Sequence, residues 1–406
     1  MKLLVIATTV LAASQSALGF SIGWLENVYH QDQQKLVELE KNLRIDTFAD
    51  SLTDYKVNGH SLIGLHKALV EIPSISENEV AVAKALSGFL KRFGLTVELQ
   101  KVPAKDGHSP RYNVYAYIGK TRDTSVLITS HIDTVPPFIP YHVEGSRIYG
   151  RGTCDAKGSV ASQIFAVLSL IAQGKVKEGD ISLLYVVGEE MNGSGMLQAS
   201  NSLNATWETA IFGEPTELKL GVGHKGNYMF ELFVEGKPSH SGYPELGISA
   251  TEILIPVLAD LLKLDLPKSD LLGPSTLNIG RIEAGVAANV VPAHSYAECF
   301  IRVADGLEKI DELVRGVVEG VEHLTFKLGP TIEPQYIDYD VPGFESIVLA
   351  YATDIPHLVG QTLKKRYLYG PGSIHVAHGD NEYVENSDLL EAVDGYKKLI
   401  THCLQV

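Results

Sequence analysis

Four short clusters of acidic and histidine residues, each following an apolar β-branched run, are the feature of this sequence that most restricts its fold. They are centred on His131, Asp155, the Glu189-Glu190 pair and Glu214. The apolar runs before them cover residues 126–129, 148–149, 181–187 and 210–212. In an open α/β sheet, the loops at the carboxyl ends of the strands converge on one crevice where ligands bind. Imidazole and carboxylate groups gathered there, without paired thiols, are typical of a catalytic divalent-metal site.

Length and charge limit the class of protein further. At 406 residues the chain exceeds the usual size of one hydrophobic core, so two domains are expected. Hydrophobic residues make up 45% and charged residues 20%, a balance typical of a globular protein. Acidic residues outnumber basic ones by 49 to 34, and the net charge of −15 disfavours nucleic-acid binding.

The order of expected strands and helices divides the chain. Up to about residue 220 the two types alternate, which predicts an α/β domain with a mostly parallel sheet. Within it, Ser76 with Glu79 three residues later predicts a capping box at the start of a helix. From residue 228 the pattern becomes strand-helix-strand-strand-helix-strand, which describes a ferredoxin-like module. The predicted catalytic domain covers residues 58–221 and 331–406, and the predicted insertion covers residues 222–330.

The amino terminus has the features of a secretory signal peptide. Met1-Lys2 precedes an apolar run and small residues that end at Gly19. This pattern predicts a signal peptide over residues 1–19 and a secreted, extracellular protein. Residues 20–57 are expected to form a lead-in or a processed segment. No later apolar run approaches the roughly 20 residues of a membrane span, so no membrane partner is expected.

The cysteine and asparagine positions indicate which modifications of an extracellular protein are expected, namely disulfides and glycans. The three cysteines allow at most one disulfide, so a disulfide framework is not expected. Asn204 begins an Asn-Ala-Thr sequon in a polar stretch and is predicted to carry a glycan. Asn192 begins a second sequon, but a sugar there would block the predicted crevice, so this residue is expected to be unmodified.

Five motifs in a fixed order carry a family resemblance. They are His131-Ile132-Asp133-Thr134-Val135-Pro136, Gly150-Arg151-Gly152 through Asp155 to Gly158, Gly188-Glu189-Glu190, Gly213-Glu214-Pro215-Thr216, and Gly370-Pro371-Gly372-Ser373 followed by Ala377-His378-Gly379-Asp380-Asn381-Glu382. With these motifs the chain resembles the zinc-dependent family of acetylornithine deacetylase, succinyl-diaminopimelate desuccinylase, aminoacylase and glutamate carboxypeptidase. Within it, the chain resembles the secreted carboxypeptidases of fungal type. The resemblance covers nearly all of the chain after about residue 60. It implies a di-zinc exopeptidase-like α/β domain with an inserted α+β ferredoxin-like lid or dimerisation domain.

The resemblance also implies a set of metal ligands. Asp155 would bridge two zinc ions per subunit, with His131 and Glu214 completing one site and Glu190 and His378 the other. Two cations roughly 3.5–4 Å apart need a shared anionic ligand, which agrees with a bridging carboxylate. Cobalt or manganese can take the place of zinc because these metals share such ligands.

Further roles follow from the same resemblance and from spacing. Glu189 is the implied general base, which takes a proton from metal-activated water and passes it to the leaving amine. Asp133 shares a face with His131 in an extended segment and is expected to accept its other imidazole N–H. His375 is an alternative to His378 as a ligand, but it lacks the Ala-His-Gly context.

Several residues match the family's substrate-binding positions. His240 matches a histidine of the inserted domain that stabilises the oxyanion, often across a homodimer interface. An ordinary loop histidine is an equal alternative for that residue. Asn289 and Arg302 match residues that hold the substrate carboxylate or line the cleft. Gly372 and Ser373 are expected to offer backbone N–H groups to the same carboxylate.

Three functions remain open at this stage. A carboxypeptidase that cleaves peptides next to a free carboxylate is preferred, because the predicted signal peptide places the protein outside the cytosol. The alternative enzyme is an N-acyl amino acid deacylase similar to acetylornithine deacetylase. A non-catalytic binding protein with the same fold would be expected to lose ligands or the base, whereas all of them are present here.

Overall fold

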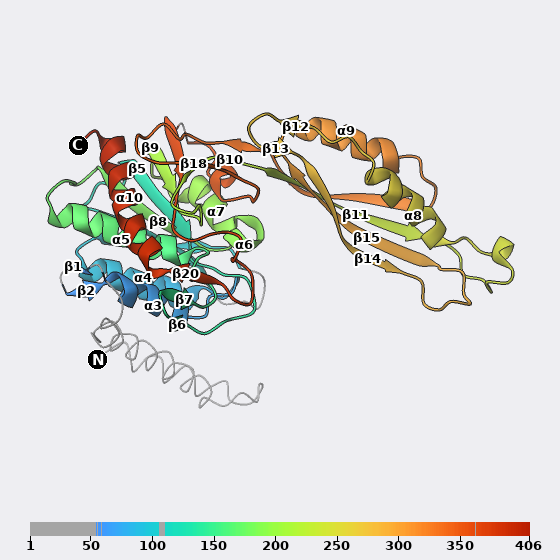
Figure 1. Ribbon diagram of the computed structural model, residues 1–406, viewed down its shortest axis with the longest axis horizontal. Coiled ribbons are helices and arrows are strands. Elements are labelled where there is room, and N and C mark those ends of the chain that lie inside the picture. The colour runs from blue at the N-terminus through green and yellow to red at the C-terminus, as the bar shows by residue number, and fades with distance from the viewer. Residues whose placement is uncertain (1–53, 55, 58, 105–109, 362) are drawn as a thin grey trace, which may run out of the picture. The chain divides into compact units, whose positions relative to one another are not determined.

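The computed structural model describes residues 54, 56–57, 59–104, 110–361 and 363–406 (Figure 1). The predicted signal peptide and nearly all of the predicted lead-in segment over residues 20–57 lie outside the described residues.

The central element is a six-stranded mixed sheet. Its strands β5, β8 and β9 are labelled in Figure 1. The three pairs β19-β9, β9-β5 and β5-β8 are parallel, whereas β4 is antiparallel to both of its neighbours, β8 and β3. The mostly parallel α/β sheet expected from the sequence is therefore confirmed. In spatial order the strands are β19 (Lys365–Leu368), β9 (Trp207–Phe212), β5 (Thr124–His131), β8 (Ile181–Val186), β4 (Arg111–Tyr117) and β3 (Thr96–Val102).

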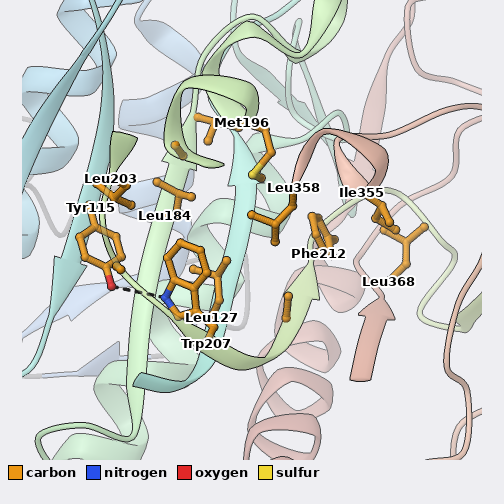
Figure 2. Packing of buried hydrophobic residues seen from close by; sticks show 14 of the residues in the cluster. Tyr115, Leu127, Leu184, Met196, Leu203, Trp207, Phe212, Ile355, Leu358 and Leu368 are labelled. Atoms are coloured by element: carbon orange, nitrogen blue, oxygen red, sulfur yellow. Dashed lines mark hydrogen bonds between the residues drawn. The ribbon is translucent and has the colours of Figure 1, made fainter. Parts of the chain in front are cut away.

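Both faces of this sheet are buried, as the all-buried strand β8 shows. Successive side chains of a strand point to opposite faces. Leu184 and Val186 join an apolar cluster with Met196 of helix α7 (Ser194–Ser202), part of which is drawn in Figure 2. The Tyr185 hydroxyl instead donates to the Val160 carbonyl of helix α5 (Lys157–Ala172) at 3.5 Å. A parallel strand that is buried on both faces has apolar residues at nearly every position, which explains the apolar run over residues 181–187. The helices of this domain are α3 (Leu62–Glu71), α4 (Val80–Arg92), α5 (Lys157–Ala172), α7 (Ser194–Ser202) and α10 (Asn386–Leu404).

The predicted capping box at α4 is wrong. Glu79 is the N-cap residue and makes no side-chain capping bond; its buried carboxylate pairs with Arg111 at 2.7 Å. Ser76 instead donates its hydroxyl to Asp133 Oδ2 at 2.7 Å. Both side chains therefore serve tertiary contacts, because a buried charge needs a partner more than an exposed helix end does.

Residues between β10 (Leu220–His224) and β17 (Gln335–Tyr336) form a second sheet that is fully antiparallel. Its strand order, β14-β15-β11-β16, together with two helices is the predicted ferredoxin-like arrangement. Phe230 is fully buried between this sheet and its helices. The elements in chain order are β11 (Gly226–Glu235), α8 (Ala250–Leu261), β14 (Thr276–Ala284), β15 (His294–Val303), α9 (Leu307–Val318) and β16 (Leu324–Ile332).

Smaller elements complete the chain. Strand β10 pairs with β17 and with β18 (Ser346–Leu349), and a separate three-stranded sheet has the order β20-β7-β6. Within the described residues, no helix combines the length and apolar character needed to cross a membrane. The remaining short elements are β1 (Lys56–Val57), β2 (His60–Ser61), β6 (His142–Glu144), β7 (Arg147–Tyr149), η2 (Pro244–Leu246), β12 (Lys268–Ser269), β13 (Gly273–Pro274), η3 (Ile355–His357) and β20 (Tyr383–Glu385).

Candidate metal centre

The five predicted ligands lie on loops and strand ends of the α/β domain. His131 is the last residue of β5, Glu214 follows β9, and Glu190 belongs to the short helix α6 (Glu189–Asn192) after β8. Asp155 lies between β7 and α5, and His378 lies between β19 and β20. Strands β5, β8 and β9 are parallel neighbours, so their carboxyl ends meet at one edge of the sheet.

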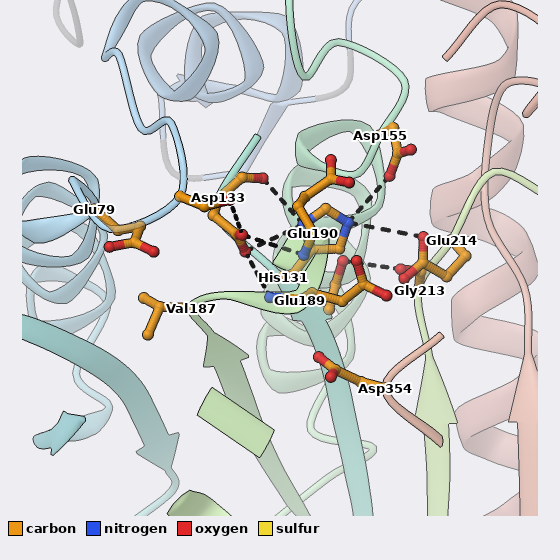
Figure 3. Close-up of polar contacts among 12 residues, drawn as sticks. Glu79, His131, Asp133, Asp155, Val187, Glu189, Glu190, Gly213, Glu214 and Asp354 are labelled. Carbon is orange, nitrogen blue, oxygen red and sulfur yellow. Dashed lines mark hydrogen bonds and ion pairs between the residues drawn. The ribbon is translucent and has the colours of Figure 1, made fainter. Parts of the chain in front are cut away.

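The Asp155 carboxylate lies between two histidines. Its Oδ1 atom is 3.0 Å from His131 Nε2, and its Oδ2 atom is 3.3 Å from His378 Nε2. Glu214 approaches the first histidine at 3.8 Å, and Glu190 approaches the second at 3.0 Å. The dashed contacts from His131 to Asp155 and Glu214 are visible in Figure 3. The structure therefore brings all five predicted ligands together in two groups that share Asp155.

This donor set suits divalent cations. Ligand atoms of His131, Asp155 and Glu190 all lie within 4.8 Å of one another. Glu190 Oε1 is buried and has no hydrogen-bond partner among the described residues. A buried carboxylate oxygen without a donor is costly unless a cation binds it. Imidazole and carboxylate ligands of this kind are the ones that catalytic zinc sites use.

The electrostatics of the cluster point the same way. Burial, followed by the neighbouring Asp155 charge, raises the pKa of Glu190 to about 7. Burial also raises the pKa of Glu214 to about 7, although the nearby His131 opposes this rise. Hydrogen bonds to Asp155 and Glu190 raise the pKa of His378 to about 10. The carboxylates therefore repel one another in a dry site, and positive charge relieves that repulsion.

Asp133 contacts the site differently from the expectation. His131 Nδ1 lies 3.0 Å from the main-chain carbonyl of Asp133 and 3.6 Å from its carboxylate, so the carbonyl is the nearer acceptor. The carboxylate accepts the N–H groups of Glu189 at 3.2 Å and Glu190 at 3.3 Å, besides the Ser76 hydroxyl. Asp133 therefore holds both the histidine and the start of helix α6.

Glu189 stands beside the ligands on a very short helix. Glycines with positive φ flank this helix, Gly188 at 75° and Gly193 at 63°, and a side chain is disfavoured in that conformation. Burial raises the pKa of Glu189 well above its usual range, and the Glu214 and Asp354 charges add to the rise while His131 opposes it. A carboxylate in such surroundings readily takes up a proton.

A groove of about 470 Å³ opens onto the site. Its acidic and histidine lining includes the ligands Asp155, Glu190, Glu214 and His378, and it also includes Glu189. The rest of the lining is largely apolar and contains Met191, Leu197, Met229, Phe300, Pro330, Ile332, Tyr351 and Ile374. A mostly apolar groove with a few convergent polar groups is the usual form of a site for small ligands.

The predicted substrate-binding residues divide into two sets. Arg302 lines the groove and donates to Asn227 Oδ1 at 3.0 Å. His240 and Asn289 are exposed, are not among the lining residues, and lie near each other in the insertion, where Ser241 donates its N–H to the Asn289 carbonyl.

Gly372 and Ser373 have other partners in this structure. The Gly372 carbonyl accepts the Glu217 N–H at 2.8 Å, and Ser373 donates its hydroxyl to Glu217 Oε1 at 2.9 Å. Neither residue belongs to the groove lining, although the adjacent Ile374 does.

Two features of the site were missed from the sequence. His357 lines the groove and lies 3.3 Å from the buried Asp354, and no motif marks this pair. Arg151 and Glu382 form a buried ion pair between two ligand loops. Arg151 and Glu382 both lie inside the motifs given above. Their charge and their position next to ligands in the sequence could have predicted that they pair.

Comparison with known proteins identifies the family. Residues 127–402 match the sequence profile of Peptidase family M20/M25/M40. The chain belongs to this family. The M20 chain is 55% identical over 347 residues to a peptidase M20 domain-containing protein of Schizosaccharomyces pombe, with 86% of each chain covered. It is 48% identical over 384 residues to a probable carboxypeptidase of Aspergillus flavus, covering 86% of this chain and 91% of the relative.

Solved structures share the fold of this M20 chain. A tripeptidase from Staphylococcus aureus superimposes with a TM-score of 0.72 at 21% identity, covering 85% of this chain and 98% of that one. An M20 family metallo-carboxypeptidase from Sulfolobus solfataricus gives 0.69 at 19% identity, covering 85% and 99%. The sequence relatives and the site together make the protein a metallopeptidase, as the motifs predicted.

Proposed function

We propose that this protein is a secreted two-zinc carboxypeptidase, which cleaves the amide bond next to a free carboxylate of a peptide. The observation that carries the proposal is the placement of Asp155, whose two oxygens face different histidines. In this proposal His131 and Glu214 would hold one cation, Glu190 and His378 would hold the other, and Asp155 would be a ligand of each. When bound, such cations act as Lewis acids and lower the pKa of a coordinated water.

The protein's own side chains divide the remaining tasks. Glu189 accepts the proton of the attacking water and returns it to the leaving amine, a role supported by its place in the groove lining beside the ligands. Asp133 keeps Glu189 in place by accepting its backbone N–H. The Arg302 guanidinium, on the groove wall, binds the free carboxylate of the substrate by charge-assisted hydrogen bonds.

The sequence relatives favour peptides over N-acyl amino acids. The Aspergillus flavus relative, at 48% identity, is named as a probable carboxypeptidase. The largely apolar groove supports binding of a peptide with apolar side chains. Activity of the deacylase type is the competing outcome of the same assay.

The test compares two classes of substrate with the zinc-loaded mature protein. Turnover of N-blocked dipeptides and of N-acetylornithine is followed with and without a chelator. Chelator-sensitive release of the carboxyl-terminal residue supports the proposal. A preference for N-acetylornithine would replace it with a deacylase, and inactivity on both with two metals bound would contradict it.

The proposed location rests on the amino-terminal sequence, which has the features of a signal peptide. Protein recovered from culture medium should begin after residue 19, and retention of Met1 would contradict secretion. Asn204 is exposed and is the proposed glycan site, so Asn204→Gln should remove a mass shift that endoglycosidase also removes. A homodimer through the insertion is proposed from the family resemblance, and sedimentation equilibrium at micromolar concentration tests it.

A further inference from the structure

Two loops that carry metal ligands are joined by a buried ion pair. One loop runs from Gly150 to Asp155, and the other begins at His378 and reaches Glu382. Arg151 Nη1 lies 2.8 Å from Glu382 Oε2, and the two side chains are only 1% and 0% exposed. Burying two charges costs free energy that the ion pair alone does not offset, so such a pair needs further hydrogen bonds. The other partners of Arg151 and Glu382 therefore show what the pair holds in place.

The second oxygen of Glu382 is bonded to the loop that carries the bridging ligand. Glu382 Oε1 accepts the N–H groups of Gly152 at 2.9 Å, Cys154 at 3.1 Å and Asp155 at 3.2 Å. The Gly150 N–H also donates to the main-chain carbonyl of Glu382 at 3.1 Å. One carboxylate therefore determines the path of the backbone into Asp155.

Arg151 reaches in the other direction, to the loop that carries the second histidine. Its guanidinium donates to the carbonyls of His378 at 3.3 Å and Gly379 at 3.2 Å. His378 has a φ of 63°, the left-handed conformation that residues other than glycine rarely adopt. Such a conformation persists where surrounding contacts hold it.

We propose that Arg151 and Glu382 are positioning residues that set the orientation of Asp155 and His378 toward the cations. Neither residue binds a cation itself, because each side chain is already committed to the other and to backbone groups. The inference rests on the proposed metal centre. Removing a group that orients a metal ligand typically costs about 10- to 100-fold in metal affinity.

The experiment uses the full protein with Co²⁺ as the probe. Glu382→Gln keeps the size of the side chain and removes its charge, and Arg151→Lys keeps the charge and removes the fork of donors. The control is Glu98→Gln, because Glu98 makes a two-pronged pair with Arg122 at 2.9 and 3.0 Å and contacts no ligand loop. Co²⁺ affinity is measured by chelator competition, the visible absorption spectrum is recorded, and unfolding of the metal-free protein is followed separately.

Glu382→Gln should bind Co²⁺ about 10- to 100-fold more weakly and change the visible spectrum, while Glu98→Gln matches the wild type. Arg151→Lys should weaken the second cation more than the first, because the guanidinium donates directly to the His378 carbonyl, whereas the backbone N–H of Asp155 is held by Glu382. Should Glu382→Gln fail to fold, Arg151→Lys decides the question alone.

Wild-type affinity and spectrum in the folded variants would overturn the positioning role and leave the metal centre intact. Equal loss in the Glu98 control would also overturn it, because the effect would then be general destabilisation. Absence of Co²⁺ binding by the wild-type protein would instead refute the proposed function itself.

Discussion

His378 Nε2 lies 3.0 Å from a carboxylate oxygen of Glu190, although the two residues come from distant parts of the sequence. The histidine side chain is half exposed, whereas the glutamate side chain is only 6% exposed. The Glu190 backbone N–H donates to the Asp133 carboxylate, which fixes Glu190 in the buried part of the site. The His378 loop therefore completes the site from its solvent-exposed side.

Replacing His378 by alanine should remove one of the two proposed cations. Metal analysis should fall from two ions per chain toward one, and kcat/KM should fall by at least about 100-fold because one Lewis acid is lost. His375→Ala is the matched control, since His375 is exposed and lies three positions away in the same loop. If His375→Ala loses the metal and His378→Ala does not, the ligand assignment is wrong.

Glu189→Gln should separate chemistry from metal binding. The amide cannot accept a proton, so kcat should fall by about 10²- to 10⁴-fold while the metal content stays at the wild-type value. Steady-state kinetics with a dipeptide and metal analysis of the same sample check this. If the variant keeps most of its turnover, Glu189 is not the general base.

The buried neutral His224 should contribute less to stability in acid. Burial lowers the pKa of His224 to about 4, and its ring is held by the Lys225 carbonyl at 2.9 Å and Thr353 Oγ1 at 3.1 Å. The unfolded chain binds this proton near the ordinary histidine pKa of about 6.5. At this one group the unfolded state therefore holds more protons between these values, and the contribution of His224 to the free energy of unfolding should decrease by about 3 kcal/mol as pH falls from 6.5 to 4.

The comparison of His224→Gln with the wild type isolates this contribution. The variant should be less stable at pH 7, and the difference in free energy of unfolding should shrink as the pH falls. Urea unfolding across this pH range measures both curves, with the exposed His402→Gln as the control. Parallel curves for wild type and His224→Gln would show that His224 does not titrate in this way.

Phe230→Ala should destabilise the insertion and spare the metal centre. Phe230 is fully buried with Tyr228 and Phe326 as aromatic neighbours, so truncation should cost about 3–5 kcal/mol. Thermal unfolding measures the loss, and Co²⁺ titration at low temperature should still give the wild-type stoichiometry. Loss of metal in the folded variant would mean that the insertion and the centre are not energetically separate.

Local pattern was enough to place the candidate ligands at one edge of the sheet, whereas their ligand roles came from the family resemblance. His131 ends a buried parallel strand and Glu214 follows another, and topology brings such strand ends together whatever lies between them in the sequence. The inserted sheet was predictable for a related reason, because its strands alternate and its helix α9 has a clear apolar stripe.

Side chains recruited over long distances could not be predicted in this way. The Ser76 hydroxyl has a helix-capping pattern, yet Asp133 takes it because the buried carboxylate needs donors. His357 reaches the groove only through the path of the segment after β18, and neither periodicity nor spacing encodes that path.

The loop between β19 and β20 also determines when the centre can form during synthesis. Glu214 and His378 are separated in the sequence by the whole ferredoxin-like insertion, so a ribosome delivers the histidine after β11 to β16 have emerged. A nascent chain that ends before β19 contains four of the five proposed ligands but lacks His378, which completes the second proposed metal site. Closing this long-range contact is an entropically costly, late step. Uptake of the second cation should therefore coincide with the addition of β19 beside β9, and would report that the sheet is complete.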